Sequence, residues 1–380
     1  MGNKLYKYFF NEFFRLFILI LISLSLIVWV VQAVNYLDIV TEDGHAFNIY
    51  FTFSTLNLPK VISKLIPFSF MLGLFLTILK FDKNNELIIA WVNGINKINF
   101  VNLVLRIAIL ITLIQLVLAS SITPYTLNMG RSALKSSDIG LFPSLLKEKK
   151  FNDTVENLTI FIEEKKDNGE LVNIFLRDDT IKVDQSKTII AKKGYLKKIN
   201  SRNYLTLYDG IIQTEKQNGK ISFIKFTKTE INLSSFATKT TTFAKLQERS
   251  SFLLFNCFNV FDNEKFLSFE TSSKEWKCPD DKKEISRELN RRFGMPLYIP
   301  LISLIICYLF STRQESKYYS FQKYLIFSFA FVVIVFAEIM VRYSVNSNIN
   351  LFIYYLFPFC LILLIYINLI RKFKFENLLK

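Results

Sequence analysis

The sequence predicts an α-helical membrane protein with a β-rich ectodomain, in which six transmembrane helices flank one antiparallel β domain as three plus three. Apolar residues make up 51% of the 380-residue chain, and they gather in long blocks. Between the third and fourth blocks, the sequence changes to short runs rich in β-branched and aromatic residues. Lys and Arg flank the blocks unevenly, and this asymmetry indicates an orientation in the membrane.

Each apolar block has the length of a membrane span, because about 20 helical residues cross a hydrocarbon core of about 30 Å. The blocks lie at 13–34, 61–81, 100–120, 296–311, 322–341 and 351–370. The first block is predicted to remain as a span, since its apolar core is longer than that of a signal peptide and no small-x-small cleavage site follows it.

Basic residues gather on one side of the predicted membrane. They occur at the N-terminus, between the second and third blocks, between the fourth and fifth, and in the tail, and include Lys4, Lys83, Lys97, Lys323 and Arg371. The positive-inside rule therefore places both termini in the cytoplasm and the long segment on the opposite side. The predicted domains are 1–120, 121–290 and 291–380.

The segment 121–290 reads as a β sandwich or an open, jelly-roll-like sheet. Runs such as LTIFIEEK and LVNIFLRDD are typical of strands. The predicted turns between strands are Asp167-Asn168-Gly169, Asp209-Gly210 and Asn218-Gly219.

Residues for catalysis are missing from the sequence. The single histidine, His45, has no second His or Cys close by in the chain, so no metal site is predicted. No phosphate-binding Gly-x-x-x-x-Gly-Lys-[Ser/Thr] motif occurs, so we expect no ATPase site, no catalytic residue and no cofactor in this chain. The net charge of +15 follows largely from membrane topology, and nucleic acid is not an expected partner.

Several charges lie at the predicted outer membrane edge, against the cytoplasmic bias. Two explanations stay open for this set: contact with an anionic lipid, or ordinary snorkelling of long side chains to the interface. The residues are Lys60, Lys64, Arg131 and Lys135, together with Arg342 at the end of the fifth block. Glu338 lies inside the fifth block, one helical turn before Arg342, and a structural pair is favoured there over a proton relay.

The connection between the second and third blocks contains a short amphipathic helix at about 84–95. Asp82, Asn84 or Asn85 can cap its start, and Gly94 is placed to end it. Its apolar stripe has helical spacing and consists of Ile88, Trp91, Val92 and Ile95. Such a helix either lies on the membrane surface or docks on a partner.

Two stretches resemble the lipopolysaccharide export permeases of the LptF/LptG family. One is LPKVISKLIPFSFMLGLFLTILKFDKNNELIIAWVNGIN, at 58–96, and the other is ELNRRFGMPL, at 288–297. The runs in the predicted sheet are also similar to the family's periplasmic domain. The loop VNYLDIVTEDGHAFNIY, at 34–50, favours the LptF branch, although its acidic residues replace the basic ones that family members can place there.

The resemblance implies a multi-pass permease in the bacterial inner membrane with a periplasmic sheet. It would pair with a second LptF/LptG-type subunit, a dimer of the cytoplasmic ATPase LptB, LptC and periplasmic LptA, and would move lipopolysaccharide. ATP would be bound by the ATPase, and the helix at 84–95 would dock on that ATPase, with Glu86 as its polar contact. Lys60, Lys64, Arg131 and Lys135 would then contact lipid phosphates. The alternatives are a membrane-anchored sensor or scaffold, and a mechanotransmission permease that moves no lipid.

Of four cysteines, Cys257 and Cys278 fall in the predicted ectodomain and are expected to form a disulfide. Closing a loop of about 20 residues would stabilise the fold by about 3 kcal/mol in the chain-entropy model. Thiol labelling of intact protein should modify neither residue before reduction. Labelling of both without reductant would refute the pairing.

Overall fold

A computed structural model of the chain describes residues 2–41, 46–138, 148–155, 158–166, 169–179, 186–199, 202–215, 221–232, 245–262, 282–311 and 318–378. By their contacts, these residues divide into two compact units. The first unit comprises Met1–Val30, Asn57–Leu127 and Leu246–Lys380, and the second comprises Val31–Leu56 and Asn128–Lys245.

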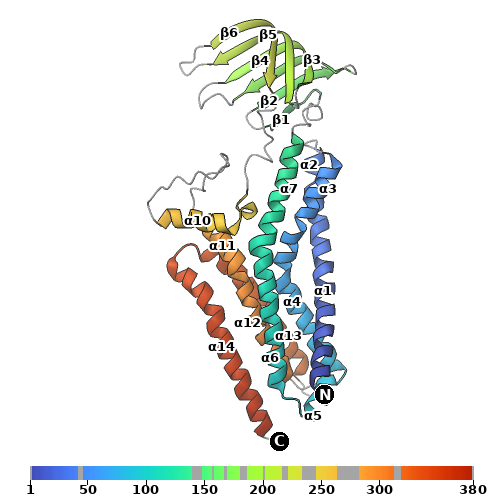
Figure 1. Cartoon of the computed structure of the whole chain (residues 1–380), viewed down its shortest axis with the longest axis vertical. Helices are drawn as coiled ribbons and strands as arrows, with labels where there is room; N and C mark the ends of the chain where they lie inside the picture. The colour runs from blue at the N-terminus through green and yellow to red at the C-terminus, as the bar shows by residue number, and fades with distance from the viewer. Residues whose placement is uncertain are drawn as a thin grey trace. The chain divides into compact units, whose positions relative to one another are not determined.

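Six helical segments are long and apolar enough to cross a membrane, three before the sheet and three after it (Figure 1), which confirms the predicted fold class. The first three are α1 (Gly2–Asn35) with α2 (Asp38–Thr41), α3 (Phe47–Leu56) with α4 (Leu58–Lys83), and α6 (Lys97–Val117) with η1 (Leu118–Ile122) and α7 (Thr123–Asp138). The last three are α11 (Lys282–Phe293) with η4 (Met295–Leu297), α12 (Tyr298–Ile306) and η5 (Cys307–Ser311), then α13 (Tyr319–Tyr343) and α14 (Asn348–Leu378).

Helix α12 forms the centre of the first unit and packs against α4, α6, α13 and α14. Its sequence, YIPLISLII, is apolar on all sides, which is typical of a helix surrounded by other helices. Ile299, Leu301 and Ile302 are fully buried. Close packing also joins α1 to α4, where the missing side chain of Gly73 lets the backbone of Phe17 approach.

The turn from α11 into α12 is built around Gly294 and a buried polar cluster. A methyl group on Gly294 would lie 2.1 Å from Cε1 of Tyr354 on α14. Tyr298 donates a hydrogen bond to the Tyr354 carbonyl (2.9 Å), and Tyr354 donates to the Asn290 carbonyl (3.3 Å). Asn290 also donates to Ser344 Oγ (2.9 Å), so this cluster fixes the start of α12 against α13 and α14.

The second unit contains one open antiparallel sheet of six strands in sequential order. The strands are β1 (Phe151–Val155), β2 (Leu158–Lys165), β3 (Glu170–Asp178), β4 (Lys187–Ile199), β5 (Arg202–Glu215) and β6 (Ile221–Asn232). Alternate residues of β2 are buried, as expected of a strand with one covered face, and Ile160, Ile174 and Leu207 belong to its core. The described strands therefore form a meander in one sheet, and no second sheet is packed on it within the described residues.

The predicted turns have different outcomes. Of the turn predicted at 167–169 only Gly169 is described: it has a φ of +80°, and its N–H bonds to the Lys166 carbonyl (2.9 Å) between β2 and β3. Asp209-Gly210 was predicted as a turn, but β5 runs through it, with Tyr208 and Gly210 both paired to β4 and β6. Asp209 adopts a φ of 50° inside the strand, so the turn-like dipeptide marks a local kink. Asn218-Gly219 lies outside the described residues.

We predict that Gly294→Ala destabilises the helical unit by about 1–3 kcal/mol or more, because the new methyl group overlaps the buried Tyr354 ring. Thermal unfolding in detergent measures the loss. Adding Tyr354→Leu to Gly294→Ala should recover part of it, since the double variant removes the overlapping atoms. Strictly additive losses would contradict the steric explanation.

Candidate functional site

A cavity of about 310 Å³ lies in the first unit between α4, α6, η1, α11 and α13. Most of its lining side chains are polar, which is unusual among candidate membrane spans. They include Lys60, Ser63, Lys64, Gln115, Thr123, Gln247, Glu288, Arg291, Arg292 and Glu338. Charged groups in spans are costly and typically face a cavity or one another, so this cluster is the leading candidate for a functional site.

Both carboxylates of the cavity are paired with arginines of α11. Arg291 lies 3.1 Å from Glu338, and Arg292 lies 3.0 Å from Glu288. Glu338 thus pairs with Arg291 from another span instead of with Arg342, the neighbour that helical spacing favoured. The lysines Lys60 and Lys64 supply the remaining positive charge on this wall.

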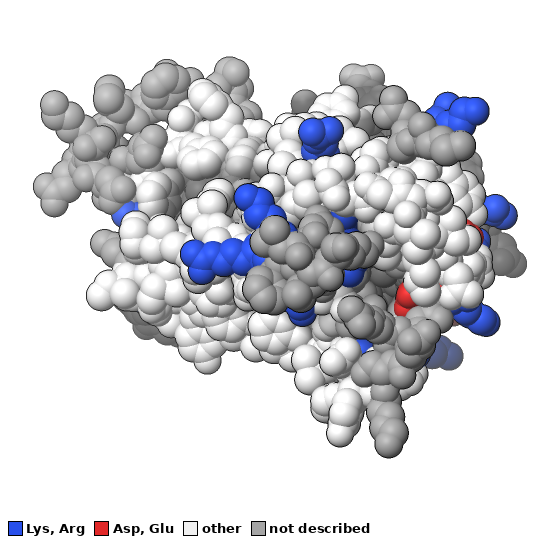
Figure 2. All heavy atoms as spheres, turned by 90° about the horizontal axis from the view of Figure 1, so that it is seen from below, with Lys and Arg blue, Asp and Glu red and all other residues white. Residues whose placement is uncertain are grey.

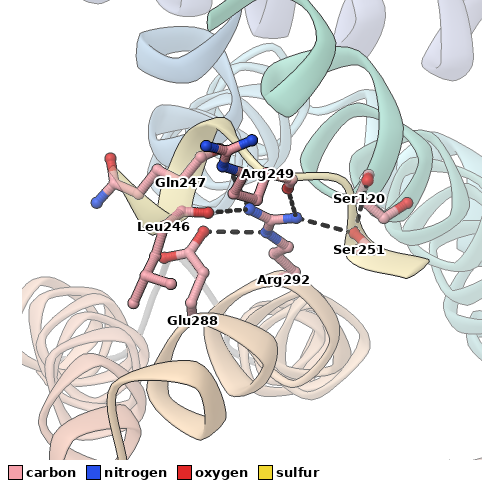
Figure 3. Close-up of polar contacts among 7 residues, drawn as sticks. All are labelled: Ser120, Leu246, Gln247, Arg249, Ser251, Glu288 and Arg292. Carbon is pink, nitrogen blue, oxygen red and sulfur yellow. Dashed lines mark hydrogen bonds and ion pairs between the residues drawn. The ribbon is translucent and has the colours of Figure 1, made fainter. Parts of the chain in front are cut away.

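Arg292 joins α11 to the segment 245–251 beside the cavity (Figure 3). Its Nε donates to Glu288, while Nη1 donates to the Arg249 carbonyl (2.9 Å) and to Ser251 Oγ (3.0 Å). Its Nη2 donates to the carbonyls of Leu246 (3.3 Å) and Gln247 (3.2 Å). All five N–H groups of this buried guanidinium are therefore used, and they secure the segment 245–251 to α11.

The third span changes to a π-helix at η1, between α6 and α7. Pro124 has no N–H group and cannot donate to the carbonyl of Ser120, four residues earlier. Ser251 Oγ donates to that carbonyl at 2.7 Å (Figure 3), and Ser251 itself accepts from Arg292. Single-turn π segments are frequent at functional sites, and Ala119 of η1 lines the cavity.

The four predicted lipid contacts are divided between the two units. Lys60 and Lys64 lie in the first turns of α4 and line the cavity. Arg131 and Lys135 lie on α7 in the second unit, where Arg131 is buried and Lys135 is exposed. Only the two lysines of α4 therefore belong to the described cavity.

At the other end of α4, α5 (Glu86–Val92) forms the predicted short helix. Gly94, with a φ of +79°, ends it by a Schellman motif: the Gly94 N–H bonds to the Trp91 carbonyl and the Ile95 N–H to the Ala90 carbonyl. Asn85 occupies the N-cap position but makes no side-chain cap, and Asn84 instead donates to Glu86 Oε1 (3.0 Å). The helix start therefore differs from the predicted cap.

The residues of the apolar stripe predicted for α5 do not all face the same surroundings in the structure. Trp91 and Ile95 pack against the protein's own core, where the Trp91 ring meets that of Phe100 at 5.2 Å. Ile88 and Val92 are exposed, by 47% and 78%, together with Ile89. The predicted stripe did not include Ile89, which is exposed in the structure. Trp91, which was predicted to be part of the docking surface, instead packs α5 against the helical bundle.

The end of the first unit that bears α5 is rich in Lys and Arg (Figure 2). Both termini lie at this same end (Figure 1). Its basic residues include Lys7, Lys83, Lys97 and Lys372, and Lys97 lies over the Trp91 ring at 5.9 Å.

Cysteine and metal chemistry add little to this site. Cys257 is buried on α10 (Ser251–Asp262) and is disulfide-bonded, while Cys278, its predicted partner, lies outside the described residues. Cys307 and Cys360 are free. Within the described ranges no group of three or more His, Cys, Asp and Glu could hold a metal ion, and His45 is not among those residues.

These features define a multi-pass membrane protein with a polar cavity in its helical unit and a β-rich domain. A sequence model described as "Lipopolysaccharide export system permease LptF/LptG" matches residues 7–372, nearly the whole chain. The chain therefore belongs to the LptF/LptG family and is a transport subunit, as its resemblance implied.

The chain is also similar to the uncharacterized protein RP871 of Rickettsia prowazekii (strain Madrid E). The two are 26% identical over 229 residues, which cover 60% of this chain and 63% of that protein. The matched region spans less than two thirds of RP871.

Arg292→Lys should lower the free energy of unfolding by about 2 kcal/mol or more, because three lysine donors cannot replace five planar ones and buried carbonyls lose their partners. The matched control is Arg291→Lys, which alters one partly exposed ion pair and should cost less than about 1 kcal/mol. Thermal unfolding of both variants measures the difference. Equal losses would show that the network around Arg292 does not stabilise the unit.

Proposed function

We propose that this chain is the permease subunit of an ABC-type complex that extracts lipopolysaccharide from the outer leaflet of the bacterial inner membrane. The family match over residues 7–372 carries this proposal. A second LptF/LptG-type subunit would complete the permease, and a cytoplasmic LptB dimer would bind and hydrolyse ATP. Lipopolysaccharide would pass through LptC to periplasmic LptA.

The proposed orientation puts α5 and both termini in the cytoplasm and the sheet in the periplasm. It is supported by the basic residues at the α5 end of the first unit (Figure 2), since cytoplasmic flanks of spans carry an excess of Lys and Arg. The cavity then lies toward the outer leaflet, because Lys60 and Lys64 are at the opposite end of α4 from α5.

Coupling to the ATPase would use the exposed side of α5. Ile88, Ile89 and Val92 present an apolar surface, and burying such side chains in a groove is worth about 1.5–3 kcal/mol each. Glu86, in the first turn of α5, would supply the polar contact. Trp91 and Ile95 would act indirectly, by fixing α5 to the bundle through Phe100 and its neighbours.

Lipid recognition would begin at the basic groups of the outer membrane edge. Lys60 and Lys64 line the cavity of the first unit, and Arg131 and Lys135 of the second unit are the other two residues proposed to contact lipid phosphates. The path to LptC and LptA would use the sheet. Among the described strands β6 is an edge, and its exposed Phe223 and Ile224 suit pairing with a strand of another protein.

Ile89→Asp combined with Val92→Asp should reduce ATPase co-purification at least tenfold, because two apolar contacts are replaced by charges that would be buried on docking. Both side chains are exposed, so the fold of the permease should not change. Asn99→Asp adds an exposed charge nearby and serves as the control. Full ATPase recovery and full lipopolysaccharide-stimulated hydrolysis in the double variant would refute docking through α5.

A further inference from the structure

Gln115 lies on the cavity wall with a buried acceptor that has no partner. The side chain is only 3% exposed, and its Nε2 donates to the Ser63 carbonyl at 3.1 Å. That bond fixes the orientation of the amide, because a carbonyl accepts only from the nitrogen end. The Oε1 atom then has no hydrogen-bond partner, and neither does Thr123 Oγ1 on the same wall.

An unpaired buried acceptor costs about 1–3 kcal/mol, and most such groups in proteins are satisfied. Gln115 sits near the end of α6, in a candidate span, where an apolar residue would avoid this cost. Because the residue lines a cavity, a group bound there can supply the missing donor. An occupant that carries an O–H or N–H group would satisfy this acceptor directly.

The charges of the wall restrict the occupant further. Four cationic side chains face the cavity against two carboxylates. Both carboxylates are paired with arginines, and the two lysines of α4 bring the number of positive side chains on this wall to four. No hydrogen bond or ion pair joins Lys64 to another described residue, which leaves its ammonium group available to an anion.

We propose that this cavity binds a phosphorylated headgroup that carries a hydroxyl group beside the phosphate. The phosphate would contact Lys64 and Lys60, and the hydroxyl would donate to Gln115 Oε1. A zwitterionic headgroup lacks the net negative charge that the wall favours, and a phosphodiester without a hydroxyl leaves Gln115 unpaired. The volume of about 310 Å³ is at the lower end of the range for small-ligand pockets, so it suits a headgroup.

Two lipids carry this chemistry: the phosphorylated sugar of lipopolysaccharide and the glycerol headgroup of an anionic phospholipid. The proposal rests on the proposed function only in placing the cavity at the outer leaflet. The proposal adds that Gln115 recognises a hydroxyl group of the lipid. Transport of an anionic lipid alone does not require such recognition.

Native mass spectrometry of the purified permease complex tests the preference for a headgroup hydroxyl. It compares the binding of two phospholipids that have equal charge and identical acyl chains. Phosphatidylglycerol has headgroup hydroxyls, and phosphatidylpropanol has none. We expect the complex to bind phosphatidylglycerol about fivefold to tenfold more tightly, as one added hydrogen bond predicts. Equal binding of the two lipids would overturn the proposal.

Variants test whether Gln115 causes the preference for a headgroup with a hydroxyl group. Gln115→Leu and the more closely isosteric Gln115→Met remove the acceptor, and both should abolish the preference. Thr112→Val is the matched control, because Thr112 is buried one turn earlier on α6 and bonds only to the Ala108 carbonyl of its own helix (2.8 Å). Lys64→Gln should weaken both lipids equally. A preference that survives in a folded Gln115→Met protein would overturn the assignment.

Competition with lipopolysaccharide identifies the source of the headgroup. Displacement of phosphatidylglycerol assigns the cavity to the phosphorylated sugar, and retention assigns it to a bilayer phospholipid. Failure of the proposed function would appear separately, as ATP hydrolysis that does not respond to lipopolysaccharide while the Gln115-dependent preference persists.

Discussion

The guanidinium of Arg292 is the contact on which the helical unit most depends. Buried backbone carbonyls near a membrane have little water to pair with, so a protein donor must satisfy them. Arg292 does this for three carbonyls of the segment 245–251, those of Leu246, Gln247 and Arg249. It also donates to Ser251, which donates to the Ser120 carbonyl that Pro124 cannot reach as an i+4 donor. Its own charge is balanced by Glu288. With Arg292 fixed on one side of α11, the adjacent Arg291 is directed toward Glu338, so one buried network also shapes the cavity wall.

Two long helices, α4 and α13, run from the wall of the polar cavity to the end of the first unit that bears α5. Helix α4 carries Lys60 and Lys64 near its start, while Asp82 near its end accepts a hydrogen bond from Tyr319 at the start of α13. Helix α13 carries Glu338 near its own end. Both helices therefore run from the cavity wall to the α5 end, where the Tyr319–Asp82 hydrogen bond joins them. In the proposed function, this arrangement would connect the ATPase-docking helix to the cavity at the opposite end of α4.

The sequence was sufficient to predict features that follow from local pattern. The six spans, the β-rich domain and the end of α5 at Gly94 depend on apolar length, strand composition and a left-handed residue. Long-range contacts were not predictable in this way: Glu338 pairs with Arg291 and not with its helical neighbour Arg342, and Trp91 turns inward to meet Phe100. Asp209-Gly210 became part of β5, because pairing on both sides outweighed the turn preference. The i, i+4 spacing of Glu288 and Arg292, and Pro124 four residues after Ser120, were the available signals for the network.

The central claim is that this chain moves lipopolysaccharide by using ATP hydrolysed on another subunit. Reconstitution of the co-purified complex in liposomes with fluorescent lipopolysaccharide tests it directly, with release to a periplasmic acceptor protein as the measured quantity. The account predicts release that requires ATP, the ATPase subunit and this chain, and that leaves labelled phosphatidylethanolamine in the bilayer. Release without the ATPase, or equal extraction of both lipids, would contradict it.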